Sequence, residues 1–330
     1  MNKESHTEAP AHPFIRLPEM DLANFISTPS NQTGFIDLSH LRLLRVSGED
    51  AETFLQSQFS NDLYSLPDGK AQMHAYCNPK GRAFAILQLL RNRDAFWILL
   101  PASMADPFMG RLKMFVMRAK VEIETDPDRF ALGIAGIEDP SMIPSIIPSI
   151  LPETQSVFQY SPLRHLIIAT TPTMTNPEIR PNTRTYHSDL WRWLDIREGI
   201  PQVYTTTSES FIPQNINLDL IDGISFKKGC YPGQEIIARI KYLGKPKHRM
   251  IAGRVESDEP IREGAAIHAP ERPGQKAGLV VDAVQTGTRC HEVSAMVPVA
   301  AVAAVADGCL SLHCASGPPL QRIPIPYAIP

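Results

Sequence analysis

The spacing of apolar and polar residues predicts alternating strands and helices in the first half of the chain. Strand-forming residues fill positions 35–48, and apolar side chains then recur at helical spacing over positions 51–59, with an end expected near Asn61. Two apolar runs within residues 73–101 flank the polar group 91–94 and predict a hairpin. Strands and helices mixed in this way predict an α+β fold.

A further helix is predicted over residues 107–119, PFMGRLKMFVMRA. Its apolar side chains, including Phe108 and Phe115, are expected to lie largely on one face. The methionines here, Met114 and Met117 among them, are expected to fill gaps in the core, because the flexible thioether side chain suits irregular spaces.

Composition shifts along the chain predict its division into units. Residues 1–30 are polar and show little periodicity, which predicts a loose leader. Residues 31–244 form the predicted main domain, with two sub-units joined near residues 138–162, where prolines recur. A helix inside this domain is expected to stop at Gly199. Short β runs cut by glycine and proline predict a small β-barrel and tail over residues 245–330.

Composition also bounds the partners and the compartment. The chain has 32 lysine and arginine residues against 35 aspartate and glutamate residues, a formal charge of −3. This balance predicts no direct nucleic-acid binding through a global basic field, and leaves only a local patch open. No apolar run approaches the roughly 18 residues that span a bilayer, and residues 1–20 lack the apolar centre of a secretion signal. We therefore expect a cytoplasmic protein without membrane contact.

The five cysteines are scattered and odd in number, which argues against a disulfide framework. Cys290, Cys309 and Cys314 have histidines close by in the sequence but lack the repeated ligand spacing of a zinc site. We expect free thiols and no metal, and the sequence assigns these three cysteines no role.

The most distinctive stretch is KKGCYPGQEIIAR at residues 227–239. Its glycines and proline predict a tight loop, and the apolar positions that follow predict a helix opening at about Gly233. Cys230 would then lie near a helix N-terminus and two lysines, which favour a thiolate. No histidine lies nearby to act as a base, so a packed structural cysteine is an equal alternative.

Three groups of polar residues could bind an anion or a polar ring. Lys227, Lys228 and Arg239, with Gln234 and Glu235, suit a carboxylate or phosphate at a helix N-terminus, although solvated surface charge is the alternative. The turn at residues 77–82 carries two cations and is more often a plain hairpin tip. Asp195 could accept paired N–H bonds from an aminopyrimidine ring, or could be an ordinary surface acid.

The motif KGCYPGQE, with the segments FIPQ, NPKGR and LDIREGIP, resembles the signature of the YgfZ family of folate-binding proteins. That family is similar to the aminomethyltransferase (T-protein) of the glycine cleavage system. The resemblance implies an aminomethyltransferase-like folate-binding core of two sub-domains, closed by a C-terminal small β-barrel. It also implies tetrahydrofolate, or a one-carbon derivative, as the ligand.

The resemblance places seven residues at the folate site: Asp195, Lys228, Cys230, Tyr231, Gln234, Glu235 and Arg239. Cys230 is the candidate for chemistry. One departure concerns Arg197, which stands near the position where the T-protein pattern has a glutamate. This departure puts the T-protein's own pterin contact, and with it aminomethyl transfer, in doubt.

Three functions follow as hypotheses. The first is a folate-binding accessory protein for maturation or repair of iron-sulfur enzymes, which supports tRNA modification indirectly and has those enzymes or assembly proteins as partners. The second is a folate-dependent aminomethyl or one-carbon transferase. The third is a non-catalytic scaffold for iron-sulfur assembly. The sequence leaves open whether the protein is an enzyme.

Overall fold

The computed structural model describes residues 34–92, 95–135, 156–162, 164–170, 184–269, 275–304 and 310–330. The predicted leader, most of the predicted junction at 138–162 and Cys309 lie outside the described residues.

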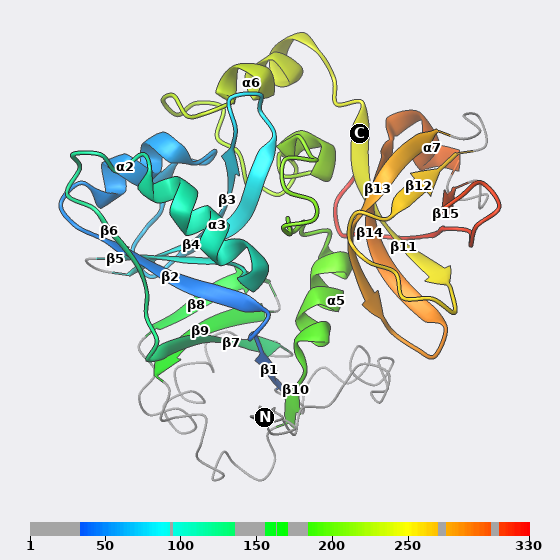
Figure 1. Ribbon diagram of the computed structural model, residues 1–330, viewed down its shortest axis with the longest axis horizontal. Coiled ribbons are helices and arrows are strands. Elements are labelled where there is room, and N and C mark those ends of the chain that lie inside the picture. Colours follow the sequence, from blue (N-terminus) through cyan, green and yellow to red (C-terminus); the bar gives the residue numbers. More distant parts are fainter. Residues whose placement is uncertain are drawn as a thin grey trace, which may run out of the picture.

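Three β-sheets surround a central helix, α5 (Ser188–Glu198) (Figure 1). In both views α5 stands between the two N-terminal sheets and the C-terminal sheet. Trp191 and Trp193 of this helix are almost fully buried, in a core to which all three sheets contribute side chains. Gly199 caps the helix in the left-handed conformation, as its sequence position predicts.

The first sheet is antiparallel with the order β3-β4-β5-β2-β6. Its strands are β2 (Leu41–Ser47), β3 (Ala71–Cys77), β4 (Ala83–Asn92), β5 (Ala95–Pro101) and β6 (Glu122–Thr125). Helices α2 (Ala51–Gln58) and α3 (Ala102–Lys113) bury Leu55 and Phe108 in the core on one face. The opposite face of β3 and β4 carries Met73 and Ile86, which pack against the segment 200–237.

The second sheet has the order β10-β1-β7-β9-β8. Its strands are β1 (Gly34–Asp37), β7 (Arg129–Ala135), β8 (Ser156–Ser161), β9 (Arg164–Thr170) and β10 (Arg184–Tyr186). Pairing is antiparallel except between β1 and β10, which run parallel.

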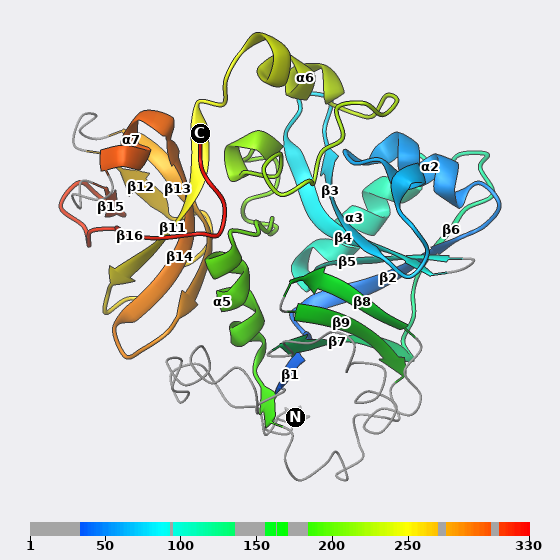
Figure 2. The same cartoon turned by 180° about the vertical axis from the view of Figure 1, so that it is seen from behind.

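The C-terminal sheet has the order β15-β12-β13-β14-β11-β16 and curls on itself (Figure 2). Its elements are β11 (His248–Glu256), β12 (Ala266–His268), β13 (Lys276–Gln285), β14 (Cys290–Pro298), helix α7 (Val299–Ala304), β15 (Ser311–Leu312) and β16 (Gln321–Ile323). The strand-rich composition predicted beyond residue 244 is confirmed, while closure into a complete barrel remains a prediction.

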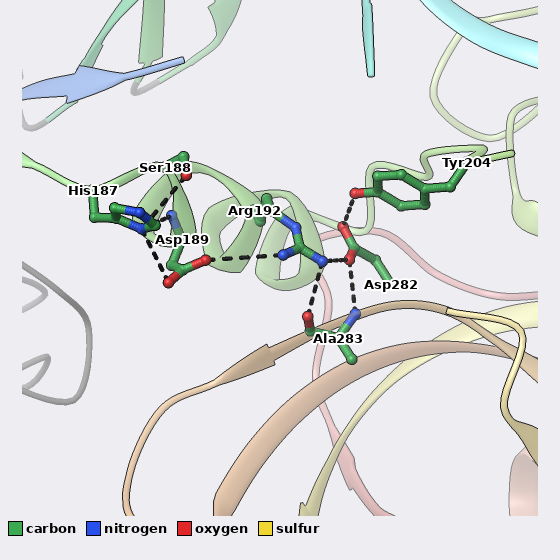
Figure 3. A network of polar contacts seen from close by, with 7 residues as sticks. All are labelled: His187, Ser188, Asp189, Arg192, Tyr204, Asp282 and Ala283. Carbon is green, nitrogen blue, oxygen red and sulfur yellow. Dashed lines mark hydrogen bonds and ion pairs between the residues drawn. The ribbon is translucent and has the colours of Figure 1, made fainter. Parts of the chain in front are cut away.

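Polar contacts join α5 to this sheet (Figure 3). Arg192 donates to the Asp282 carboxylate and, across 3.0 Å, to the Ala283 carbonyl. The hydroxyl of Tyr204 donates to Asp282 Oδ2 over 2.8 Å. Because Asp282 is 2% exposed, these donors stabilise its buried carboxylate in place of water. The network therefore fixes the sheet against the helix.

Two local predictions have different outcomes. The hairpin is confirmed, with β4 ending at Asn92 and β5 beginning at Ala95. The helix predicted over 107–119 is wrong in its limits, because α3 begins at Ala102 and ends at Lys113. Met114 and Met117, expected in the core, follow the helix on exposed turns, with Met117 89% exposed. Once the helix ends, helical spacing no longer turns these side chains inward.

Among the described residues, no helix is long and apolar enough to cross a membrane.

Candidate functional site

A cavity of about 500 Å³ lies between β3 and β4 on one side and the end of α5 on the other. Residues 160–162 and Tyr327 complete its wall. Met73 and Ile200 contribute to a predominantly apolar lining. A cavity of this size, apolar with a few polar groups, suits a small organic molecule.

Two glutamines supply unpaired acceptors at this cavity. Gln72 and Gln88 both line it, and their side-chain Oε1 atoms are buried without a hydrogen-bond partner in the described structure. Gln88 is 7% exposed and interrupts the apolar run that β4 carries from Ala83 to Leu90. Because an unpaired buried acceptor costs free energy, these atoms favour a ligand with N–H or O–H donors.

Arg164 organises the carboxylates beside the cavity. It is fully buried and donates from Nε to Glu198 Oε1 over 3.0 Å, and from Nη2 to Glu198 Oε2 over 2.9 Å. The same Nη2 donates to Asp195 Oδ1 over 2.9 Å, and the guanidinium lies over the rings of Tyr160 and Trp191. Glu198 lines the cavity and keeps 22% of its side chain exposed, so its carboxylate is oriented toward ligands by a rigid partner.

Asp195, predicted at the folate site, lies behind this cavity wall. Its carboxylate accepts from Arg164 and, over 3.0 Å, from the hydroxyl of Tyr160. Only 2% of Asp195 is exposed, and burial raises its pKa from 3.8 to about 6 although the Arg164 charge opposes this. The alternative of an ordinary surface acid is therefore wrong. Direct contact of Asp195 with folate remains a prediction.

Lys228 of the 227–239 loop is also buried, and its ammonium closes the end of α2. Nζ donates to the carbonyl oxygens of Gln56, Phe59 and Asn61 over 2.6, 2.6 and 2.8 Å. These bonds satisfy carbonyls that a helix C-terminus leaves unpaired. Burial lowers the pKa of Lys228 to about 8. The ammonium thus anchors the loop to the first sheet and its helix.

The other predicted residues of the segment 227–239 divide into buried and exposed groups. Tyr231 is 6% exposed and packs in the core below the loop, and Gln234 lies half-buried. Cys230 is exposed, and helix α6 (Gln234–Leu243) follows the N-cap Gly233, as predicted. Glu235 and Arg239 form an exposed ion pair of 3.0 Å with each other. Because Cys230 is exposed, the alternative that it is a packed structural cysteine is wrong.

The hairpin tip at residues 77–82 holds the loop in place. A Cβ atom on Gly233 would lie 2.5 Å from Asn78 O and 2.7 Å from Gly81 Cα, so the two backbones touch directly. Gly233 also has φ = +82°, which glycine adopts without cost. This tip is more than a solvent-exposed turn, because it packs against the start of α6.

The structure divides the predicted site residues into two places. Asp195 lies next to the cavity, while residues 228–239 are not among the described residues that line it. The residues predicted from the sequence do not include Glu198, Gln88 or Arg164. A signal existed for two of them: Glu198 follows Arg197 in the LDIREGIP segment, and Gln88 is a polar residue inside an apolar strand.

Arg197 is not among the described residues that line the cavity. Its guanidinium donates to both carboxylate oxygens of Glu292, which is 1% exposed and also accepts from Trp193 Nε1 over 2.8 Å. Arg197 therefore serves the contact between α5 and β14.

Comparison with known proteins gives a consistent family relationship. The family model described as the GCVT N-terminal domain matches residues 26–175. The glycine cleavage system aminomethyltransferase T from Bartonella henselae shares the fold with a TM-score of 0.59 and 16% identity, covering 89% of this chain and 86% of that protein. The chain thus has an aminomethyltransferase-like fold of mixed helices and sheets, with a curled C-terminal sheet.

Curated relatives are more similar in sequence. The tRNA-modifying protein YgfZ of Escherichia coli O157:H7 (strain EC4115 / EHEC) is 32% identical over 220 residues, covering 63% of this chain and 68% of that protein. The protein of the same name from Colwellia psychrerythraea (strain 34H / ATCC BAA-681) is 29% identical over 246 residues, covering 72% and 76%. Its counterpart in Escherichia coli O17:K52:H18 (strain UMN026 / ExPEC) is 30% identical over 227 residues, covering 65% and 70%.

Proposed function

Because this chain belongs to the YgfZ family of tRNA-modifying proteins, we propose that it binds tetrahydrofolate, or a one-carbon derivative, as an accessory protein for iron-sulfur enzymes. In this proposal it supports the maturation or repair of those enzymes and, through them, tRNA modification.

The observation that carries the proposal is the pair of unpaired acceptors beside an oriented carboxylate in the 500 Å³ cavity. A reduced pterin is a bicyclic ring system with a planar pyrimidine half, and its amino and ring N–H groups donate hydrogen bonds. Gln88 Oε1 and the Glu198 carboxylate offer acceptors to such donors, while Met73 and Ile200 offer apolar contact. The residues present therefore fit a pterin, with Arg164 holding Glu198 in position.

Folate supplies one-carbon and reducing chemistry when it is bound. The chain's own residues bind and orient the ring, and the apolar cavity wall limits water around it. Cys230 remains our candidate for a chemical step because its thiol is exposed on an anchored loop. The proposed folate site also includes Lys228, Tyr231, Gln234, Glu235 and Arg239.

Calorimetry with the purified protein and 5-formyltetrahydrofolate, a stable reduced folate, tests the binding proposal. Glu198→Gln is expected to raise Kd roughly tenfold, because a charge-assisted hydrogen bond is replaced by a neutral one. Gln88→Leu is expected to weaken binding without touching the Arg164 contacts. The control Glu49→Gln changes an exposed carboxylate outside the cavity and is expected to leave Kd unchanged.

Two results would contradict the proposal: no binding by the wild-type protein, or equal affinity in all variants. The iron-sulfur role is tested separately in a strain that lacks the native protein. Wild-type chain is expected to restore the activity of iron-sulfur enzymes, and Cys230→Ala to restore less of it than the control Cys314→Ala, which also removes an exposed thiol. Full restoration by Cys230→Ala would remove the thiol from the proposal.

Two alternative functions can be distinguished from this proposal by experiment. Aminomethyl transfer is the first alternative: Arg197 is engaged by Glu292 and offers no carboxylate to a pterin, whereas the neighbouring Glu198 presents one at the cavity. Turnover with the lipoyl carrier protein of glycine cleavage would support this transferase, and its absence at high protein concentration would exclude it. A non-catalytic scaffold predicts that Cys230→Ala captures partners as well as the wild type does, which a pull-down with iron-sulfur assembly proteins measures.

A further inference from the structure

The surface around α6 carries a strong local positive charge. Between Phe226 and His248 the exposed charged residues are five cations and one carboxylate, Glu235. The cations are Lys227, Arg239, Lys241, Lys245 and Lys247. Only Arg239 has a carboxylate partner in the described structure, namely Glu235. This charge contrasts with the formal charge of −3 of the whole chain.

An aromatic pair stands inside this positive surface. The ring of Tyr242 meets the ring of Phe226 edge to face, with centroids 6.2 Å apart, and Lys241 Nζ lies 5.1 Å from the Phe226 centroid. Phe226 is half-buried and supports the pair, while Tyr242 is 65% exposed. The contact brings the C-terminal end of α6 against the residue that precedes Lys227, so the two segments that carry the exposed cations meet at this aromatic pair.

The surface is also hollowed next to this pair. A cleft of about 450 Å³ is lined by Lys241 and Lys245 together with the apolar groups of Ile240 and Pro246, and the Asp219–Arg249 ion pair forms part of its wall. In Figure 1, α6 lies at the top of the molecule, and its residues Lys241 and Tyr242 are exposed, as is Lys245 just beyond it.

From these contacts we propose that the α6 surface, defined as Phe226, Lys227, Arg239, Lys241, Tyr242, Lys245 and Lys247, binds single-stranded RNA. Lysine side chains contact phosphates, and an unpaired base stacks on the exposed ring of Tyr242. This site is separate from the cavity, shares only Arg239 with the proposed folate-site residues, and does not depend on folate binding. It revises the expectation, drawn from total charge, that the protein makes no direct contact with nucleic acid.

Other macromolecules fit this surface less well. The centre of a protein interface is depleted of charged residues, whereas Lys241 lies at the aromatic pair and further exposed lysines stand in the same two segments. A helix that lies on a membrane inserts an apolar face along its length, but α6 turns Ile237 into the core and packs Ile236 close to Gly81, which leaves the exposed aliphatic side chain of Leu243 at its C-terminal end. Stacking on a ring surrounded by cations is characteristic of single-stranded nucleic acid.

Fluorescence anisotropy with a labelled, unstructured RNA of about 16 nucleotides tests the proposal, a length at the upper end of single-strand site sizes. Lys245→Gln/Lys247→Gln is expected to weaken binding and to lower the salt slope by about 1.4, since each lost phosphate contact on a single strand contributes about 0.7. The control Lys113→Gln/Lys276→Gln removes two exposed lysines elsewhere and is expected to change neither quantity.

Tyr242→Ala separates stacking from charge. It is expected to raise Kd at least fivefold, the lower end of reported stacking contributions, with the salt slope unchanged. Tyr64→Ala is the matched control, because Tyr64 is 59% exposed in another part of the molecule. Retained binding of 5-formyltetrahydrofolate by these variants would show that their folds are intact.

The proposal is overturned if the wild-type protein does not bind the RNA, or if the control variants lose as much affinity as the test variants. It is also overturned if polyglutamate of equal charge displaces the RNA as well as unlabelled RNA does, which would identify an acidic protein surface as the partner. Equal displacement by phosphatidylserine vesicles would identify a membrane instead.

Discussion

Arg197 of α5 is bound in a bidentate ion pair by Glu292 of β14, with Arg197 Nε 2.5 Å from Glu292 Oε2 and Nη2 2.6 Å from Oε1. Glu292 is 1% exposed, so its carboxylate depends on this partner, on Trp193 and on Arg254. The residue that departs from the T-protein pattern is thus structural, and it connects α5 to the C-terminal sheet.

Replacing Arg197 by methionine is expected to lower the free energy of unfolding by about 3 kcal/mol, because it leaves a buried carboxylate without its main partner. Arg254 remains near Glu292 and keeps the loss at the lower end of the usual range. Urea unfolding monitored by tryptophan fluorescence measures the change. The control Arg45→Met breaks an exposed pair with Glu124 and is expected to cost at most about 1 kcal/mol. Equal losses in both variants would argue against the structural role.

Gly233→Ala is expected to destabilise the protein by about 3 kcal/mol, combining the cost of a left-handed alanine with overlap against the backbone. The new Cβ would lie 2.5 Å from Asn78 O. Gly229→Ala is the matched control in the same loop, because no atom lies within 4 Å of its Cβ position. The control is expected to remain within about 0.5 kcal/mol of the wild type. Thermal unfolding of the two variants compares them, and similar melting temperatures would contradict the contact.

Gln88→Leu is expected to leave the stability of the ligand-free protein unchanged, or to raise it by about 1 kcal/mol. The reason is that the substitution removes a buried acceptor without a partner. The same change is expected to weaken binding of reduced folate. Parallel measurements of unfolding and calorimetry check both effects. A large loss of stability would show that Gln88 is structural and would withdraw it from the cavity's proposed role.

Asp195 is expected to make stability fall as pH rises from about 4 to about 6.5. Burial raises its folded pKa from 3.8 to about 6, so in this window the folded protein binds more protons than the unfolded chain does. Below this window the protonated carboxyl of Asp195 contributes its full stabilisation. This contribution is lost as pH rises through the folded pKa of about 6. The wild type is thus expected to lose roughly 2 kcal/mol relative to Asp195→Asn across the window.

Urea unfolding of both proteins at several pH values measures this difference. Asp258→Asn is the control, because Asp258 is exposed and paired with Arg289 at the surface. Its stability difference from the wild type is expected to stay nearly constant over the same range. If the wild type instead gained stability relative to Asp195→Asn as pH rises, the result would contradict the raised pKa.

Local sequence signals predicted several elements correctly because neighbouring residues decide them. The hairpin at 91–94 follows from two apolar runs that pair across a short turn, and α6 opens at Gly233 where a glycine permits the left-handed backbone. The limits of α3 were missed, since Ala102 and Lys113 mark a helix that continues through Pro107, a residue that usually marks a helix boundary.

The sequence by itself determined the family, the α+β composition, the strand-rich C-terminal part and the distinctive loop around Cys230. Only the tertiary structure decided what the charged residues do. Asp195 and Lys228 are buried against Arg164 and the carbonyls of α2, partners from distant parts of the chain. Burial and pairing depend on which segments meet in space, and residue type alone does not specify that. For the same reason Glu198 and Gln88 become candidate ligand contacts only once the cavity they line is known.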